Sequence, residues 1–440
     1  MLLDVPTSLA GLLSLFGCCF TQPSFQTFCV LVTGCLTRVR AHTVTGILIA
    51  SGLAGRWHHS RAHRFFSRAR WSVDQVGLRL LELVVERLMS TGEPLCVAID
   101  DTLLRRFGPK VFGRQAHYDA SAVRGPRPSR VAFGNSWVVA GAVIRLPFLE
   151  RAICLPVLFR LWRPGQTGTQ VELAAELVRL IAGAHPDRRL IVLVDGAYAG
   201  GALAPAGLPE AVTVIARVRR DIHLHAPAPP RSKGQVGRPR SKGQPLTPVR
   251  ARAAAGGPWR QAQVNISGEA TTIEFFEQQG IWYRSWGTAP VKVVAIRDRR
   301  ASDQLEMVLI SSDPKLNAPE IVELYSRRWS IEVAFRDAKQ HGGVGEAQNR
   351  TRLAVERTAP FAFLCLSLAI IWYALAGHHQ DNVAHRRHAW DRTKRTPSVQ
   401  DMLVKLRRTI IAERLSNALD AQPTAAKITA LTDAWEMAVA

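Results

Sequence analysis

Between residues 95 and 195 the chain places three short apolar runs, one helical stretch and a fourth apolar run, and this order restricts the fold more than any other feature. The first three runs, at 95–100, 137–146 and 153–161, are rich in β-branched and apolar residues and have the length of strands. A helical stretch at 168–185 follows, and LIVLVD at 190–195 is a further strand. Strands interrupted by a helix in this way predict a mixed α/β sheet.

The segments around this sheet differ from it in composition and predict a chain of several parts. Residues 1–90 read as a helical N-terminal domain that binds DNA, and residues 377–440 as a helical, basic C-terminal region. The predicted α/β domain, 91–376, is interrupted at about 218–290. That interruption begins with a loop rich in Pro, Gly and Lys/Arg and continues in strand-like runs, so we expect a mainly β insertion.

The charge of the chain is strongly positive. Lys and Arg number 57 against 35 for Asp and Glu, which gives a formal charge of +22, while the hydrophobic fraction of 47% is that of a folded protein. A folded, strongly basic protein usually has a polyanionic partner. Charge alone favours nucleic acid, and it leaves an anionic membrane surface or ribosomal RNA as alternatives.

Two basic segments are candidates for contact with DNA phosphates. GRWHHSRAHRFFSRARW, at 55–71, interleaves arginines with aromatic residues, although a solvated helix face over a local core is the alternative. GRPR, at 237–240, resembles the core of an AT-hook, which lies in the minor groove, although general attraction to phosphates also explains it. The arginines expected to contact DNA are Arg61, Arg64, Arg68, Arg238 and Arg240.

Two features bear on where the chain resides. The seven cysteines are scattered, mostly in apolar runs, without CxxC pairs, so we interpret them as buried thiols in a reducing cytosol. The apolar run at 359–377 approaches the length of a membrane span, but it opens with Pro360 and follows a highly charged helix. A buried core helix is the favoured reading, and we expect a cytoplasmic protein with no membrane partner.

Carboxylates stand at the ends of two predicted strands. VAIDD, at 97–101, ends in Asp100 and Asp101, and VLVDG, at 192–196, carries Asp195. A carboxylate that emerges from a buried strand is held where a rigid sheet can fix a metal ion. The alternative for each residue is an Asp that caps a following turn or helix.

A third carboxylate lies on a predicted helix with three phosphate-binding groups. Tyr325, Arg328, Glu332 and Lys339 have offsets of 0, 3, 7 and 14 residues, which at about 100° per residue place them within about 60° of one another. An ion pair between Arg328 and Glu332, four residues apart, is the structural alternative. Such a pair leaves Tyr325 and Lys339 unexplained.

This pattern resembles that of a known enzyme family. Tyr325, Arg328, Glu332 and Lys339 match the YREK signature of the bacterial insertion-sequence DDE transposases, which share an RNase H-like catalytic core. DDT at 100–102 and VDG at 194–196 precede it in the family's order. The resemblance covers about 95–376, and the family tolerates a β insertion between the second Asp and the Glu.

The resemblance implies a role for each matching residue. Asp101, which precedes Thr102 and is therefore preferred to Asp100, would act with Asp195 and Glu332 as catalytic and metal-binding residues. Carboxylates suit two Mg²⁺ ions, which Mn²⁺ can replace, and such an ion pair stabilises the attacking and leaving oxygens of phosphodiester transfer. The residues implied to grip the transposon end are Tyr325, Arg328 and Lys339, with Trp282 and Trp286 as candidates for stabilising a distorted base.

The resemblance also implies partners and leaves alternatives. The DNA partners are the terminal inverted repeats of the element and a target, and the enzyme is expected to form a homodimer on DNA near the bacterial nucleoid. A catalytically dead DNA-binding protein, such as a repressor of transposition, is one alternative. A general nuclease on the same fold is another.

Overall fold

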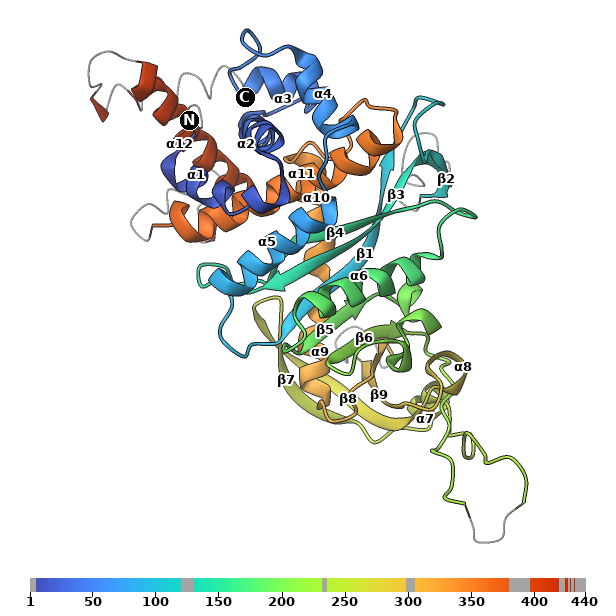
Figure 1. Ribbon diagram of the computed structural model, residues 1–440. Coiled ribbons are helices and arrows are strands. Elements are labelled where there is room, and N and C mark those ends of the chain that lie inside the picture. Colours follow the sequence, from blue (N-terminus) through green and yellow to red (C-terminus); the bar gives the residue numbers. More distant parts are fainter. Residues whose placement is uncertain are drawn as a thin grey trace.

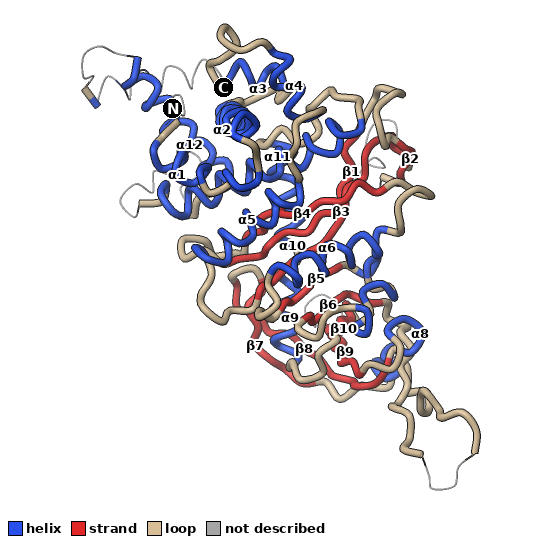
Figure 2. The backbone as a smooth tube through the Cα atoms, viewed as in Figure 1, coloured by secondary structure: helices blue, strands red, loops and turns tan. Residues whose placement is uncertain are grey.

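The computed structural model describes residues 5–119, 130–231, 236–297, 305–379 and 396–418, together with residues 424, 425, 428 and 431. Helices gather at one end of the molecule, a large sheet crosses its middle, and further strands form the other end (Figures 1 and 2). The predicted α/β class is confirmed.

Five strands form the centre of the sheet in the order β4-β3-β1-β5-β6. They are β1 (Leu95–Arg105), β3 (Val131–Ile144), β4 (Ile153–Trp162), β5 (Leu190–Val194) and β6 (Val212–Val218). Strand β3 is antiparallel to both β4 and β1, whereas β5 and β6 continue the sheet in parallel with β1. A short strand, β2 (Gln115–Tyr118), pairs with the start of β3. Every residue of β5 is buried, as expected of a parallel strand that is covered on both faces.

Helices cover the two faces of this sheet. On one face, Arg160 of β4 pairs with Asp74 of α5 (Val73–Leu88) and Glu176 of α6 (Gln170–Ala184). On the other face, Phe159 stacks on Phe363 of α11 (Arg352–Trp372), and Phe335 of α10 (Trp329–Gln340) meets the same ring. Neighbouring residues of β4 therefore face different helix layers.

Helix α6 begins where the sequence predicted. Thr169 and Glu172 form a capping box, in which each side chain accepts a hydrogen bond from the other residue's backbone N–H. Its position between β4 and β5 carries the chain across the sheet to a parallel strand.

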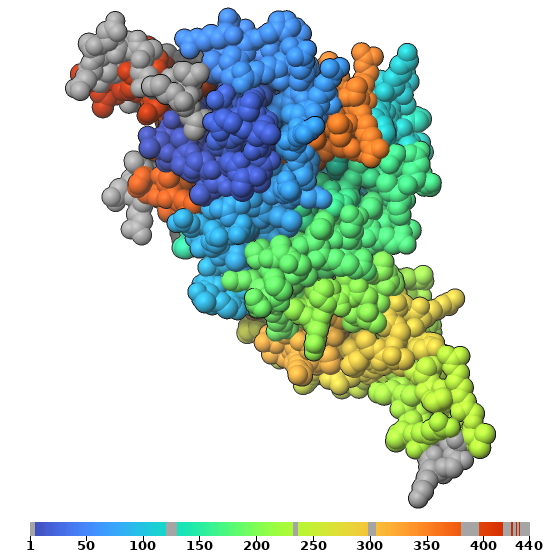
Figure 3. Space-filling view, in the orientation of Figure 1, coloured from blue at the N-terminus to red at the C-terminus, as the bar shows by residue number. Residues whose placement is uncertain are grey.

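The predicted β insertion continues the central sheet instead of forming a sheet of its own. Strand β10 (Met307–Ser311) pairs with β6, and β9 (Pro290–Arg297), β8 (Glu269–Ile281) and β7 (Arg260–Ile266) follow in order. The basic loop that precedes them forms an arm that projects from the body (Figures 1 and 3). Strand β6 itself was not predicted from the sequence.

The first and last segments of the chain form one helical unit. The N-terminal helices are α1 (Thr7–Ser14), α2 (Gln22–Thr37), α3 (Val44–Ala50) and α4 (His59–Ser67), and α12 (Val399–Ala418) packs on them. Arg407 of α12 donates to the carbonyl oxygens of Leu36 and Arg38 at the end of α2. Arg414 does the same to Ala50 and Ser51 at the end of α3. These arginines stabilise helix ends, where carbonyl groups lack partners within the helix.

Helix α11 is the predicted core helix. It continues through Pro360, because burial on all sides outweighs the hydrogen bond that proline cannot make. Within the described residues it is the one helix long and apolar enough to cross a membrane, but 83% of its most apolar window is buried inside the protein. Six of the seven cysteines are buried as predicted, and Cys18 is exposed.

The remaining elements are short. They are the 3₁₀ turns Gly17–Cys19, Gly196–Tyr198, Gly201–Leu203 and Pro205–Gly207, the π-helical turn Tyr373–Gly377 that ends α11, and the helices α7 (Val249–Ala254), α8 (Tyr283–Trp286) and α9 (Ala318–Ser326).

Candidate active site

Asp100 and Asp101 face opposite sides of the sheet. Asp101 Oδ1 accepts a hydrogen bond from the hydroxyl of Tyr198, at 3.1 Å, on the side covered by α6. Asp100 Oδ2 instead lies 3.1 Å from Nη1 of Arg328, the residue that precedes α10. Side chains alternate along a strand, so neighbours cannot share a face. Of the two aspartates, Asp100 is therefore the one directed towards the helix that carries Glu332.

Arg328 links Asp100 to Glu332. Its Nη2 lies 2.5 Å from Oε1 of Glu332, while its Nη1 holds Asp100. Burial raises the pKa of Asp100 to about 6, and the carboxylates of Asp101 and Glu332 add to the rise. The backbone N–H of Asp101 and the Arg328 guanidinium oppose it. Two carboxylates from distant parts of the chain thus share one cationic partner.

Asp195 lies beside this pair on the next strand. The parallel register joins Ile99 to Val194, so Asp100 and Asp195 follow at the same level of β1 and β5. Asp195 precedes a 3₁₀ turn, yet its side chain makes no capping hydrogen bond to that turn. The alternative role of Asp195, as a residue that only caps the turn, is therefore not supported, because the hydrogen bond that such a cap requires is not formed. Burial raises the pKa of both Asp101 and Tyr325, and the charge of Asp195 adds to both shifts.

The YREK residues lie on two helices, so the predicted single helix is wrong at this point. α9 ends at Ser326 and α10 begins at Trp329, because the backbone N–H groups of Arg327 and Arg328 bond to carbonyls three residues earlier, as in a 3₁₀ turn. Tyr325 still meets Arg328, whose guanidinium carbon lies 5.8 Å from the centre of the ring.

Lys339 lies apart from the carboxylates. It stands seven residues beyond Glu332 on α10, a rise of roughly 10 Å. Its pKa is lowered by burial, with the nearby Asp119 acting against the shift and Arg105 adding to it. Tyr325, Arg328 and Glu332 form one cluster, and Lys339 extends the same helix towards the far end of β1.

The donor atoms of the site suit a divalent ion, although the carboxylates do not form a finished cage. Oxygens from Asp, Glu and backbone groups are the usual ligands of Mg²⁺ and Mn²⁺. Within the described ranges, no group of three acidic, histidine or cysteine side chains converges as a metal site. The two carboxylates on Arg328 already satisfy one cation, so a metal ion at Asp100 and Glu332 requires the guanidinium to move aside.

Sequence reasoning missed Tyr198. The residue is 1% exposed, and burial raises the pKa of its phenol, with Asp101 and Asp100 adding to the effect. It therefore donates a proton to Asp101 in a hydrogen bond and does not ionise near neutral pH. Its only sequence signal is its place three residues after Asp195.

The basic N-terminal segment combines a local core with exposed charge. Phe65, Phe66 and Trp71 are buried, and Phe65 stacks on Trp71. The aromatic residues therefore belong to the core, as the alternative reading had it. Arg64 and Arg68 are exposed, whereas Arg61 is partly buried, lies over the ring of Trp57 and donates to Thr27.

The insertion places its candidate DNA contacts differently. Arg238 and Arg240 are exposed on the arm. Trp286 is 1% exposed, so its ring has no free face for a base, whereas Trp282 is partly buried beside it with ring centres 5.5 Å apart. The exposed aromatic residue of this turn is Tyr283, with Lys242 over its ring.

Comparison with known proteins gives one family match. Residues 15–272, more than half of the chain, match the family described as DDE superfamily endonuclease. This range contains Asp100, Asp101 and Asp195 and ends before Glu332. No curated protein matches the sequence.

Among solved structures, the piggyBac transposase in a cryo-EM synaptic complex with hairpin DNA is similar at a TM-score of 0.41 and 13% identity. The alignment covers 98% of this chain and 81% of that one. A likeness of this size supports no inference about function.

Proposed function

This chain belongs to the DDE superfamily endonucleases and is therefore an enzyme, and from this premise we propose that it is a transposase of the type carried by bacterial insertion sequences. The proposed reaction is cut-and-paste transposition, in which cleavage at the ends of the element frees 3′-hydroxyl groups that attack target DNA. The central sheet is the RNase H-like core predicted for this class.

One observation carries the proposal. Asp100 and Glu332 meet at Arg328, and Asp195 ends the strand next to Asp100 at the same level. The start of α10 thus brings Glu332 and the preceding Arg328 to the middle of β1, beside the end of β5, and so places carboxylates and an arginine together. The carboxylates suit a metal, and the arginine suits a phosphate.

Membership of the family implies dependence on a divalent metal, and we infer Mg²⁺, as two ions that Mn²⁺ can replace. Asp195, Glu332 and one of the two aspartates in the middle of β1 are the proposed ligands. The DDT motif favours Asp101, whereas the contact with Arg328 favours Asp100. When bound, the ions would stabilise negative charge on the attacking and leaving oxygens.

The neighbouring side chains position the DNA. A guanidinium binds phosphate with two parallel hydrogen bonds, so Arg328, once free of the carboxylates, is suited to hold a phosphate next to the scissile bond. Tyr325 lies within reach of the same guanidinium and is read as a second phosphate contact and not as a nucleophile. Lys339 extends the contact along α10.

We further propose the partners and location expected of such an enzyme. The exposed arginines of α4 and of the arm are available to contact the terminal inverted repeats and target DNA. Joining two ends requires a homodimer at least on DNA. The enzyme would then act in the bacterial cytoplasm at the nucleoid.

The test is metal-dependent cutting of linear DNA that carries the inverted repeats flanking the coding sequence. Wild type is compared with Glu332→Gln and Asp195→Asn. The matched controls are Glu210→Gln and Asp187→Asn, which change exposed carboxylates elsewhere. The proposal predicts that wild type and controls cut at the repeat ends, while both site variants bind the DNA without cutting.

Two other outcomes contradict it. If wild type binds the repeats and never cuts under any Mg²⁺ or Mn²⁺ concentration, the chain acts as a DNA-binding repressor. If it degrades DNA without regard to the repeat ends, it is a general nuclease.

A further inference from the structure

A groove of about 310 Å³ runs beside the start of α10, and four of the thirteen residues that line it are arginines. Its walls come from the turn between β3 and β4, the turn between β7 and β8, and the junction of α9 with α10. The charged residues along it are Arg145, Arg151, Arg327, Arg336 and Glu150. Four positive side chains thus face a single negative one.

The walls of this arginine groove are fixed by contacts between distant segments. Arg151 Nε donates to the carbonyl oxygen of Ser267, at 3.1 Å, across the groove. Gly268 has a φ of +91°, and a Cβ there would lie 3.0 Å from the carbonyl oxygen of Glu150. The two turns are therefore pressed together, and the groove is a built feature of the fold.

Most of its positive charge is not neutralised by the protein. Among the described residues, Arg145, Arg151 and Arg327 form no ion pair, and Arg336 reaches only Asp337, at 3.4 Å. The buried Nε of Arg327 has no hydrogen-bond partner there. Burial lowers the pKa of Arg327 and the charge of Arg145 lowers it further, while the charges of Glu323 and Glu93 act against the shift without forming an ion pair with Arg327. Such a site would be stabilised by an anion.

An exposed aromatic ring stands at the same place. Trp329, the first residue of α10, lines the groove and is 58% exposed. Flat aromatic rings next to arginines are typical of surfaces that bind nucleic acid, because they stack on bases or sugars while the guanidinium groups hold phosphates.

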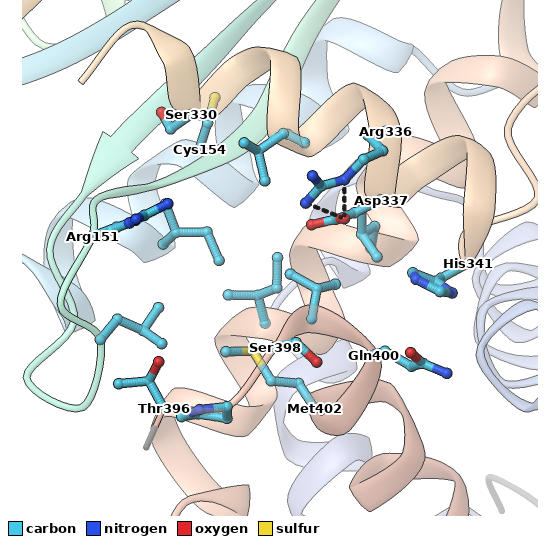
Figure 4. A pocket seen from close by; sticks show the side chains of 18 of the residues that line it. Arg151, Cys154, Ser330, Arg336, Asp337, His341, Thr396, Ser398, Gln400 and Met402 are labelled. Carbon is cyan, nitrogen blue, oxygen red and sulfur yellow. Dashed lines mark hydrogen bonds and ion pairs between the residues drawn. The ribbon is translucent and has the colours of Figure 1, made fainter. Parts of the chain in front are cut away.

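The arginine groove shares six of its lining residues with a larger cavity of about 970 Å³ between α10 and the start of α12. Figure 4 shows Arg151 and Arg336 on opposite walls of that cavity, with Arg336 bonded to Asp337. The two spaces are therefore neighbours on the same side of α10.

The groove lies next to the carboxylates along the helix. Arg336 follows Glu332 by four residues, so the two side chains stand on neighbouring stripes of α10, with a rise of about 6 Å between them. Trp329 precedes Glu332 by three residues and lies on the same stripe of α10 as Arg336, two turns before it. A DNA strand that crosses Glu332 can therefore continue over the arginine groove.

We propose that the arginine groove binds the phosphate backbone of duplex DNA beside the scissile bond. The inference rests on the proposed function, and it adds a contact surface that the YREK residues do not supply. Guanidinium groups suit phosphates better than they suit an apolar or neutral partner, and the neighbouring Trp329 favours nucleic acid over an acidic protein.

The experiment measures binding of a fluorescent repeat-end duplex by anisotropy from 50 to 200 mM salt. The test variant is Arg145→Gln with Arg336→Gln. The control is Arg87→Gln with Arg179→Gln, which removes the same charge from exposed positions on α5 and α6, across the sheet. Each phosphate contact contributes about 0.9 to the slope of log K against log salt, so two lost contacts lower the slope by about 1.8. Over this fourfold range, wild type should lose roughly 12-fold more affinity than the test variant.

A second variant separates stacking from charge. Trp329→Ala should weaken binding at every salt concentration without changing the slope, since it removes no charge. If the test and control double variants have equal slopes and equal affinities, the proposal is overturned. The arginine groove would then be assigned to another anion, such as an acidic protein. Cutting by wild type in the separate assay shows whether the proposed function stands in that case.

Discussion

Replacing Asp100 by asparagine should stabilise the metal-free protein at neutral pH. The Asp100 side chain is only 20% exposed, and burial raises its pKa from an ordinary 3.8 to about 6 in spite of Arg328. The folded state therefore binds a proton more tightly than the unfolded state, and stability falls as the pH rises from about 4 to about 6. The difference between the folded and unfolded pKa values of Asp100 corresponds to a loss of about 3 kcal/mol of folding stability when the carboxyl ionises. A neutral asparagine does not ionise and avoids this loss.

Urea unfolding in EDTA, followed by tryptophan fluorescence, measures this effect. Asp100→Asn should be more stable than wild type by about 3 kcal/mol at pH 8, and by less than about 1 kcal/mol at pH 4, where most of the cost has gone. Asp187→Asn, an exposed change of the same kind, should have little effect at either pH. A variant less stable than wild type at pH 8 would show that the ion pair with Arg328 outweighs burial, and the reasoning would be wrong.

Three further predictions concern metal binding, the hydrogen bond of Tyr198 and the packing of α5 on β4. Mn²⁺ should raise the melting temperature of wild type and of Asp101→Asn but not of Asp100→Asn; the reverse pattern would assign the metal to Asp101. Tyr198→Phe removes the hydrogen-bond donor to the Asp101 carboxylate and should cost about 1 kcal/mol of stability. Because the charged form of Asp101 loses this hydrogen bond, the acidic limb of the pH profile of DNA cutting should move to higher pH. An acidic limb that does not move would show that Asp101 is not the group that titrates there. Gly77→Ala on α5 places a Cβ 1.9 Å from the carbonyl oxygen of Val157 and should destabilise the protein by about 3 kcal/mol in urea, whereas an unchanged midpoint would mean that α5 can move off β4.

Local pattern was sufficient to locate most elements. The run at 190–195 became β5 because parallel, doubly covered strands are apolar on both faces. The run at 95–100 became only the first half of β1, which continues through both aspartates to Arg105, so the predicted strand end was wrong. Strand β6 was missed because residues 212–217, between the predicted strand at 190–195 and the basic loop that begins at about 218, were given no element. The break between α9 and α10 was also missed, because the 3₁₀ turn at Arg327 leaves the spacing of the motif unchanged.

The candidate site was predicted in its residue types but not in its geometry. Three carboxylates with Tyr325 and Arg328 could be named from motif order alone. Whether Asp100 or Asp101 meets Glu332 depends on which face of β1 the helix α10 covers, and that is a matter of long-range packing. The contact of Arg328 with Asp100, 228 residues away, has no counterpart in sequence spacing.

Most elements, the charge and the inventory of chemical groups could be read from the sequence, because these depend on periodicity and composition within short windows. Long-range packing instead sets how the N-terminal helices join α12 in one helical unit, how the insertion extends the central sheet, and how the arginine groove forms. That groove takes its walls from residues near 145, 267 and 327. Segments so far apart meet because their helices and strands bury apolar faces on a common core, and no local pattern records which faces those are.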